Sequence, residues 1–279
     1  MIRPKASPNI KAVRAVRRWL ENLHQAVNET GLLPGHRDYV RFVIVTSART
    51  GSNLLAHSIG RDDTVVVYSE ILRRQDIFPP RFARLGNSSR IFRDDPVRFL
   101  ERYIYRKYPR KVLAVGFKLF YYHAPRDSEW GRAVWRYLAG DTGLRVIHLR
   151  RRNLLAAQIS LRKADETNQW IRYSGPAQQS AMPLDFEETR ASFEQQRAWE
   201  RDAAERFAGH PLLEVFYEDL AADFSGELHR VQTFLELRVR NLSPATSKRP
   251  SQPLSEQIVN YHELKAQFAG TPWAEFFNE

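Results

Sequence analysis

Residues 42–55 constrain the fold of this chain more than any other stretch of its sequence. The apolar run from Phe42 to Val45 is typical of a buried strand, and small and polar residues follow it before an apolar helical pattern begins at Leu54. This order predicts a strand, a tight loop and a helix. Because a first helical turn has free N–H groups and the positive end of the helix dipole, the loop is a candidate anion-binding site.

The loop carries one cation and several hydrogen-bond donors. Arg49 can bind a phosphate or sulfate through two hydrogen bonds, and Thr50, Gly51, Ser52 and Asn53 follow it with backbone or side-chain donors. The loop differs from the nucleotide-triphosphatase motif G-x-x-x-x-G-K-[ST], because no lysine follows its glycine and the cation precedes it. On spacing alone, an ordinary strand-to-helix turn is the alternative interpretation.

A second strand and turn lie at residues 145–160, where a short apolar strand leads into Arg150, Arg151 and Arg152 and then into a helix. Open α/β sheets bind ligands at the carboxyl ends of their strands, which is where these arginines lie. Ser160 lies about two turns into the helix, on the face that the arginines reach. Together with the first loop, this turn predicts a second phosphate site; a solvated basic turn is the alternative.

The rest of the chain alternates between strand and helix patterns. We expect strands over 64–68, 112–120 and 212–217 and helices over 95–107, 128–138 and 185–207. Such alternation indicates a parallel sheet, and 279 residues suffice for one large domain. The predicted fold is a single α/β domain with a P-loop-like central parallel β-sheet flanked by helices.

Both turns resemble the cofactor motifs of sulfotransferases that use 3′-phosphoadenosine 5′-phosphosulfate (PAPS). The stretch from Ser47 to Leu55 is similar to the 5′-phosphosulfate loop of that family. Its 3′-phosphate site is an arginine at a strand end with a serine eight or nine residues later. Arg152 has the eight-residue spacing to Ser160, whereas Arg151 fits the His-Leu-Arg-Arg-x-Asn form of bacterial carbohydrate sulfotransferases, so both are candidates.

The resemblance extends from about Tyr39 to the end of the chain, which predicts a sulfotransferase domain over 39–279. The tail segments that carry it are 217–220, 231–235 and 253–261. The bacterial branch that includes trehalose, lipopolysaccharide and nodulation-factor sulfotransferases is the most similar. The Arg-Lys-Gly motif of the cytosolic animal enzymes is absent, and Lys248 and Arg249 are the candidate replacement for it in cofactor binding.

The resemblance implies transfer of a sulfuryl group from PAPS to a hydroxyl of a carbohydrate or glycolipid, with adenosine 3′,5′-bisphosphate as the second product. The moving group carries less negative charge than a phosphoryl group, so the electrostatics require no metal. Two other classes are alternatives: an ATP-dependent P-loop kinase, whose lysine motif is missing, and a non-catalytic polyanion-binding module.

Three residues are candidates for the chemistry. Glu70 closes the second predicted strand beside the anion loop and matches the position of the catalytic glutamate in carbohydrate sulfotransferases. Lys118 is a cation inside an otherwise apolar strand, and the family has a lysine there near the bridging oxygen. His123 is the alternative base, because cytosolic members use a histidine after a comparable lysine; a Glu70 paired with a surface arginine is the structural alternative.

Composition is consistent with such an enzyme. The formal net charge of +11 fits a polyanionic cofactor, and no nucleic-acid-binding motif accompanies it. The chain has no cysteine, which excludes disulfides, thiol catalysis and a cysteine-based zinc site. Since no apolar run is long enough for a membrane span or a signal peptide, we expect a cytoplasmic protein.

Residues 1–38 are expected to form a separate N-terminal segment with a basic amphipathic helix over 9–27. This helix is predicted either to pack on the domain or to lie on the anionic inner surface of a membrane. Four aromatic residues are candidates for stacking on sugar rings, with core packing as the alternative: Trp130, Trp135, Trp170 and Tyr173.

Overall fold

The computed structural model describes residues 35–83, 85, 87–167, 181–244 and 252–278. In this part of the chain a five-stranded sheet has the order β2-β3-β1-β4-β5, and all neighbouring strands are parallel. The strands are β1 (Val40–Thr46), β2 (Val65–Glu70), β3 (Ala114–Phe120), β4 (Arg145–Arg150) and β5 (Leu212–Phe216). The predicted single α/β sheet flanked by helices is confirmed.

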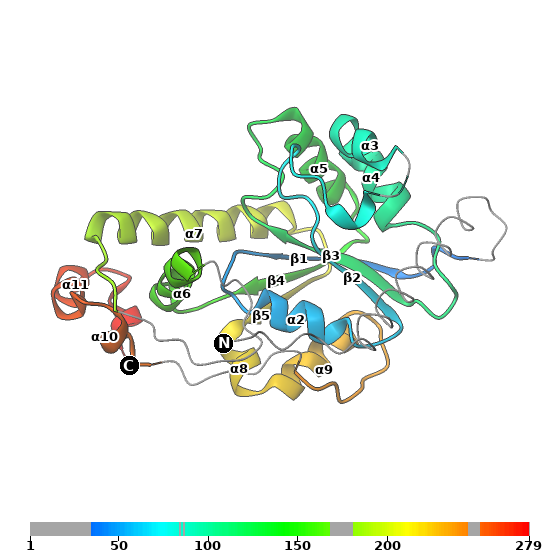
Figure 1. The fold of residues 1–279 in the computed structure, drawn as a ribbon. Helices are drawn as coiled ribbons and strands as arrows, with labels where there is room; N and C mark the ends of the chain where they lie inside the picture. The colour runs from blue at the N-terminus through cyan, green and yellow to red at the C-terminus, as the bar shows by residue number, and fades with distance from the viewer. Residues whose placement is uncertain (1–34, 84, 86, 168–180, 245–251, 279) are drawn as a thin grey trace, which may run out of the picture.

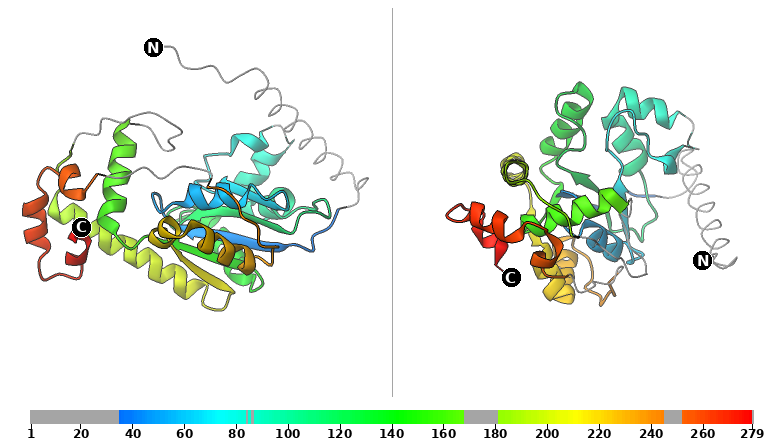
Figure 2. Two further views of the ribbon diagram at one scale, coloured as in Figure 1. Left: turned by 90° about the horizontal axis from the view of Figure 1, so that it is seen from below. Right: turned by 60° about the vertical axis from the view of Figure 1, so that its left-hand side comes forward.

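Helices cover both faces of the sheet, and a third group extends beyond the carboxyl ends of its strands (Figures 1 and 2). One face carries α2 (Ser52–Ile59), α8 (Tyr217–Ala222) and α9 (Phe224–Phe234). The other carries α3 (Ser88–Asp94), α4 (Pro96–Phe99), α5 (Glu129–Gly140) and the end of α7 (Phe186–Arg206). The extension contains α6 (Leu154–Thr167), the start of α7, α10 (Leu254–Gln257) and α11 (Tyr261–Phe268). Short 3-10 turns lie at Pro80–Phe82 and Ala274–Phe277.

The alternation of side chains along β1 divides the core into two layers. Val43 and Val45 pack with the helices α3 to α5, whereas Phe42 and Ile44 pack with α2 and α9. All four side chains are fully buried, as expected for a central strand covered on both faces. A third cluster joins α6 and α7 to the C-terminal helices and lies away from the sheet.

Close packing of β1 against β3 depends on a glycine. A Cβ atom at Gly116 would lie 2.4 Å from the carbonyl oxygen of Phe42, so a side chain does not fit there. This is the close backbone approach that a glycine inside a strand indicates. It keeps β3 in register with β1 and so places Lys118 opposite Ile44.

One sequence prediction needs correction, and for two tryptophans the structure decides between the alternatives. The helix expected over 95–107 begins at Pro96 with Asp95 as its cap, but it changes to a π-helical turn at Leu100–Ile104 and ends there. Trp130 and Trp135 are 5% and 1% exposed and donate their indole N–H groups to backbone carbonyls, so they belong to the core and not to a sugar site.

Several predictions fall outside the described residues: the amphipathic helix 9–27, Trp170, Tyr173, Lys248 and Arg249. The boundary at residue 38 also stays a prediction, because residues 1–34 are not described. Among the described helices, none is long and apolar enough to cross a bilayer.

The strand order gives the sheet a topological switch point between β1 and β4. The chain leaves β1 toward β3 and β2, and it leaves β4 in the opposite direction, toward β5. Adjacent parallel strands whose connections diverge leave a crevice at their carboxyl ends, where α/β proteins bind ligands. The loop after β1 and the turn after β4 both lie at this crevice.

Candidate functional site

The loop after β1 has an unusual backbone. Arg49 and Gly51 both have positive φ, at 64° and 80°. A Cβ atom at Gly51 would lie 2.7 Å from the ring of Tyr217, so both the conformation and the space require glycine. The loop therefore turns sharply and lies directly against the start of α8.

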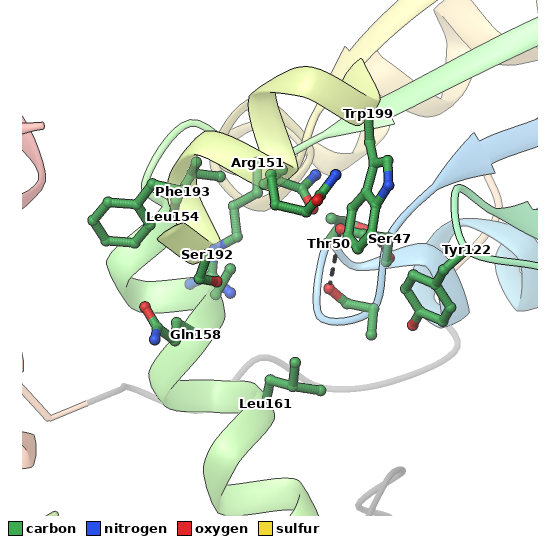
Figure 3. Close-up of a pocket in the computed structure, with 14 residues that line it drawn as sticks. Ser47, Thr50, Tyr122, Arg151, Leu154, Gln158, Leu161, Ser192, Phe193 and Trp199 are labelled. Carbon is green, nitrogen blue, oxygen red and sulfur yellow. Dashed lines mark hydrogen bonds between the residues drawn. The ribbon is translucent and has the colours of Figure 1, made fainter. Parts of the chain in front are cut away.

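Hydroxyl groups fix this loop to the neighbouring strand. Thr46 Oγ1 donates to the carbonyl of Leu149 at 2.6 Å and lies 2.6 Å from Thr50 Oγ1. Thr50 also donates to the carbonyl of Ser47 at 2.9 Å (Figure 3). These bonds tie the end of β1 to the end of β4 and hold the loop across the crevice.

The N-terminus of α2 is open. Its cap residue is Gly51, no side chain caps it, and its first turn contains no acidic residue. Ser52 and Asn53 occupy that turn, and Ser52 is buried. In the described structure, the first turn of α2 therefore places no carboxylate at the positive end of the helix. Such an end suits a bound anion.

Lys118 and Glu70 lie beside this helix end. Lys118 is fully buried; its Nζ donates to Asn53 Oδ1 at 2.5 Å and lies 3.0 Å from Glu70 Oε1. A register shift at the end of β2 pairs Glu70 with Lys118, so adjacent strands deliver the two side chains to one point. Burial lowers the pKa of Lys118, and the carboxylate of Glu70 opposes this effect.

Glu70 is the more accessible of the pair. Its side chain is 25% exposed, and the nearby arginine, Arg73, has its Nε 3.9 Å from Glu70 Oε2. The surface pairing that was the structural alternative is thus a distant contact, while the short contact is to Lys118. The site combines a buried cation with a carboxylate that solvent and a substrate can reach.

His123 has a different environment. It is 3% exposed, its ring stacks on Phe120 at 4.7 Å, and its Nδ1 accepts the backbone N–H of Phe120 at 3.2 Å. Burial, with the charges of Arg73 and Lys118, lowers its pKa to about 3. With Nδ1 used as an acceptor, the neutral ring carries its proton on Nε2, which leaves no lone pair for a substrate proton.

Arg49 joins the two turns. Its Nε donates to Ser160 Oγ at 2.9 Å, and Arg151 donates from Nη1 to the carbonyl of Arg49 at 3.0 Å. The guanidinium of Arg151 also lies 4.6 Å from the ring centroid of Tyr217, which packs against Gly51. The structure thus brings Arg49, Arg151 and Ser160 together.

Arg152 turns away from this cluster. It is half exposed and forms two hydrogen bonds with the carboxylate of Asp219, at 2.6 and 2.7 Å. Glu218 accepts from the backbone N–H groups of Arg152 and Asn153, at 3.0 and 3.2 Å. Carboxylates of the protein itself therefore accept the hydrogen bonds that these two N–H groups and the Arg152 guanidinium donate.

Sequence reasoning gave no role to Tyr217, Glu218 and Asp219, although the resemblance included their segment. Their functions depend on contacts with the two turns, which no local pattern encodes. A group of three or more side chains arranged to hold a metal ion is absent from the described residues.

A pocket opens next to the loop, with about 780 Å³ of empty space that includes its mouth (Figure 3). It lies between the loop, α6 and α7, and Tyr122 closes one side. In Figure 3, Trp199 extends from α7 over the loop that holds Ser47 and Thr50. Sequence reasoning did not single out Tyr122 or Trp199 as site residues.

The fold and the site define a parallel α/β protein with an open helix N-terminus and clustered cations at the switch point of its sheet. The chain is 29% identical over 242 residues to nodulation protein H of Rhizobium tropici. The aligned region covers 85% of this chain and 92% of the relative. Nodulation protein H of Rhizobium meliloti is 28% identical over 243 residues, with 85% and 94% covered. No family model matches the chain.

A crystal structure of a sulfotransferase from Alicyclobacillus acidocaldarius covers 85% of this chain and 94% of its own, with 17% identity and a TM-score of 0.46. The fold assignment rests on the strand order and register given above. The similarity to nodulation protein H confirms the resemblance to the bacterial sulfotransferase branch that the motifs indicated, the one that includes the nodulation-factor enzymes.

Proposed function

We propose that this protein is a sulfotransferase that moves the sulfuryl group of PAPS to a hydroxyl of a carbohydrate or glycolipid, with Glu70 as general base. One observation carries the proposal: Lys118 Nζ contacts both Asn53 and Glu70 at the open N-terminus of α2. A buried cation, an accessible carboxylate and a free helix end are what transfer of an anionic group to a hydroxyl needs. Similarity to nodulation protein H supports the same branch.

The residues present fit the two charged ends of PAPS. The uncapped helix end and Asn53 suit the phosphosulfate, and Arg49 adds a guanidinium on the same loop. Arg151 and Ser160 lie on the other side of Arg49 and suit the 3′-phosphate. On this geometry Arg151 is the better candidate of the two arginines, because Arg152 is engaged by Asp219.

The reaction needs one proton transfer. The acceptor hydroxyl oxygen bonds to sulfur while the bond from sulfur to the bridging phosphate oxygen breaks. Glu70 accepts the hydroxyl proton, because its carboxylate is the accessible base beside the helix end. With PAPS bound, Lys118 would supply positive charge to the oxygen on which negative charge develops and so would stabilise the leaving group. The products are a sulfate ester and adenosine 3′,5′-bisphosphate.

Buried Lys118 also orders the site. Its hydrogen bond to Asn53 ties β3 to the first turn of α2, and its ion pair positions Glu70 on β2. Three elements are thus held in one geometry before a substrate binds. Such preorganisation reduces the cost of aligning the reacting groups.

Isothermal titration calorimetry tests the donor assignment. We expect micromolar binding of adenosine 3′,5′-bisphosphate without metal and weak or no binding of ATP with Mg²⁺. The expected selectivity follows from the second phosphate site, which ATP does not fill. Tighter binding of ATP with Mg²⁺ than of the bisphosphate would exclude the proposal and favour a kinase.

Turnover is tested by incubating the protein with PAPS and neutral oligosaccharides, followed by mass spectrometry. We expect a mass increase for one sulfate group on a sugar, and release of the bisphosphate in equal amount. Binding of the bisphosphate with no sulfated product from any hydroxyl acceptor would leave only the polyanion-binding module.

A further inference from the structure

We infer that the pocket between the loop after β1, α6 and α7 binds an uncharged sugar ring of the acceptor, with Trp199 as the stacking surface and Gln158 as a hydrogen-bond acceptor. The inference rests on the proposed function and adds the residues that select the acceptor. Trp199 and Tyr122 are the partly exposed aromatics of this pocket, and Gln158 lies on its α6 wall.

The lining is mostly apolar, with a few uncharged polar groups and one charged side chain. Besides aromatic and aliphatic side chains, it contains hydroxyl and amide groups from Ser47, Thr50, Gln158, Ser192, Gln195 and Gln196. Arg151 is the one charged side chain among the described lining residues, and it is bonded to the carbonyl of Arg49. An indole face surrounded by amides and hydroxyls matches the alternating apolar and hydroxyl faces of a neutral sugar.

The side-chain oxygen of Gln158 lacks a hydrogen-bond partner among the described residues. Gln158 is 8% exposed, and its Oε1 is buried without a hydrogen-bond partner in the described part of the chain. Its Nε2 makes only a long contact of 3.4 Å to Thr189. A buried amide oxygen left unpaired is destabilising, so it calls for a partner beyond the protein's own groups, such as a water or a ligand. A sugar hydroxyl that donates to this oxygen would satisfy it.

The pocket connects to the reaction centre through Tyr122. Its ring lies 5.7 Å from Trp199 and 5.5 Å from Phe120, and Lys118 Nζ lies 5.1 Å from the Phe120 centroid. Burial, with the negative charge of Glu70 adding to it, raises the pKa of Tyr122 to about 12, so its hydroxyl stays protonated. A sugar held at Trp199 therefore lies on the path toward Glu70.

The pocket overlaps the donor residues only in part. Of the residues assigned to PAPS, it shares only Thr50 and Arg151 in the described chain, while Arg49 and Ser160 lie outside its lining. The loop separates the two regions, with Ser47 and Ala48 facing the pocket. This division favours the acceptor as the occupant of the pocket and the adenosine donor as the ligand of the opposite side.

Hydrogen bonds and ion pairs of Glu200 hold the pocket side of α7 in place. Glu200 is 2% exposed and accepts from Arg150 at 2.8 Å, Arg197 at 2.6 Å and Gln196 at 3.1 Å. Trp199 is the residue before it. The buried carboxylate thus fixes the register of α7 against β4, and with it the position of the indole.

The test is calorimetry on the full chain with chitotetraose, trehalose and a sulfated heparin tetrasaccharide, each beside adenosine 3′,5′-bisphosphate. We expect a neutral sugar to bind, and Trp199→Leu to weaken it by about tenfold or more while bisphosphate affinity changes less than about twofold. Trp199→Phe should restore part of the sugar affinity. Phe234→Leu, a half-buried aromatic on α9, is the matched control and should change neither.

A second pair of variants separates binding from folding. Gln158→Met should weaken the sugar by about tenfold yet leave the melting temperature unchanged or raised, because the lost oxygen has no partner. Gln232→Met should lower the melting temperature and spare the sugar, because Gln232 is buried and fully bonded to Arg240, at 2.7 and 3.0 Å.

The outcomes distinguish this inference from the proposed function. Loss of bisphosphate affinity in Trp199→Leu, with sugar affinity intact, would show that the pocket binds the donor and would overturn the inference. Binding of the sulfated tetrasaccharide alone, or of no sugar by the wild type, would also overturn it. Failure of the wild type to bind the bisphosphate, with Trp199-dependent sugar binding retained, would refute the proposed function and support the pocket assignment.

Discussion

The two strand-to-helix turns at the switch point satisfy their backbone groups in opposite ways. After β1, the helix α2 begins at Gly51 with no side-chain cap and no acidic residue in its first turn. After β4, Glu218 accepts two backbone N–H groups and Asn153 Oδ1 accepts the N–H of Ala156 at 2.9 Å. One helix end is left for an anion, and the other is filled by the protein.

The difference shows that the number of arginines does not locate an anion site. The second turn has three consecutive arginines, but Arg150 pairs with Glu200 and Glu214, and Arg152 pairs with Asp219. Of the three, Arg151 donates to the first loop. The first loop has one arginine and an open helix end, and it lies beside the buried pair formed by Lys118 and Glu70. We therefore expect unsatisfied donors, rather than total charge, to mark an anion site.

The largest expected effect comes from the carboxylate at the open turn. Glu70→Gln keeps the shape and a carbonyl oxygen for Lys118 but removes the base, so we expect kcat to fall by about 10²–10⁴-fold. Bisphosphate affinity should be nearly unchanged, because Glu70 contacts no predicted phosphate ligand other than Lys118. Steady-state rates and calorimetry measure the two effects.

Glu218→Gln at the closed turn is the matched variant. It weakens the bonds to two backbone N–H groups, so we expect about 1 kcal/mol less stability and turnover within a few-fold of wild type. Full activity in Glu70→Gln would rule out this residue as the base, and His123 would have to be reconsidered.

The second effect concerns the backbone of the open turn. Gly51→Ala places a methyl group at φ 80° and 2.7 Å from the ring of Tyr217, so we expect about 3 kcal/mol of lost stability or loop displacement. Bisphosphate affinity should fall with it. Gly140→Ala is the control, since nothing lies within 4 Å of its Cβ position. Equal melting temperatures for the two variants would contradict the described loop.

The third effect compares neighbouring arginines. Arg151→Ala should weaken the binding of adenosine 3′,5′-bisphosphate by about tenfold or more, because a charge-assisted hydrogen bond is lost. Arg152→Ala should change the affinity by less than about threefold and lower stability slightly, because its carboxylate partner is exposed. Calorimetry on both variants decides which arginine binds the 3′-phosphate, and the reverse order would reassign it.

Local patterns predicted most of the fold and, in Arg49 and Ser160, residues that the structure brings together, while the roles of the site residues stay predictions. The run Phe42 to Val45 and the change to a helical pattern at Leu54 identified β1 and α2, because burial and period are local properties. The cap at Asp95 was equally readable, but the π-helical turn after Phe99 was not. The choice between Arg151 and Arg152 depended on Asp219, which lies 67 residues from Arg152 in sequence.

The pocket was the least predictable part. Trp199 lies in a long helix that is polar over most of its length, and its aromatic neighbour Tyr122 follows a strand far away in sequence. Trp130 and Trp135 were candidates for stacking on a sugar ring or for core packing, and they pack in the core. Aromatic spacing could not separate these cases, because exposure is set by which elements cover the residue in the fold.

The smallest effect concerns the two buried histidines at the ends of β3 and β4. Burial lowers the pKa of His123 to about 3 and that of His148 to about 4, in each case helped by nearby cations. Both are therefore neutral in the folded protein at pH values where the unfolded chain, with an ordinary histidine pKa of 6.5, binds protons. Their contribution to stability is complete above that value and is lost as the pH falls toward the folded pKa values.

Below about pH 6 we expect each histidine to cost about 1.4 kcal/mol of stability per pH unit. His148→Gln retains a partner for the hydroxyl of Tyr121, which lies 2.7 Å from His148 Nε2, and removes one titrating group. Denaturant unfolding between about pH 6 and about pH 5 should therefore show a shallower slope for this variant by about 1.4 kcal/mol per unit. Phe234→Leu, which removes no titrating group, should leave the slope as in the wild type. Parallel slopes for all three proteins would mean that His148 is protonated in the folded state, and the packing described at the end of β4 would then be wrong.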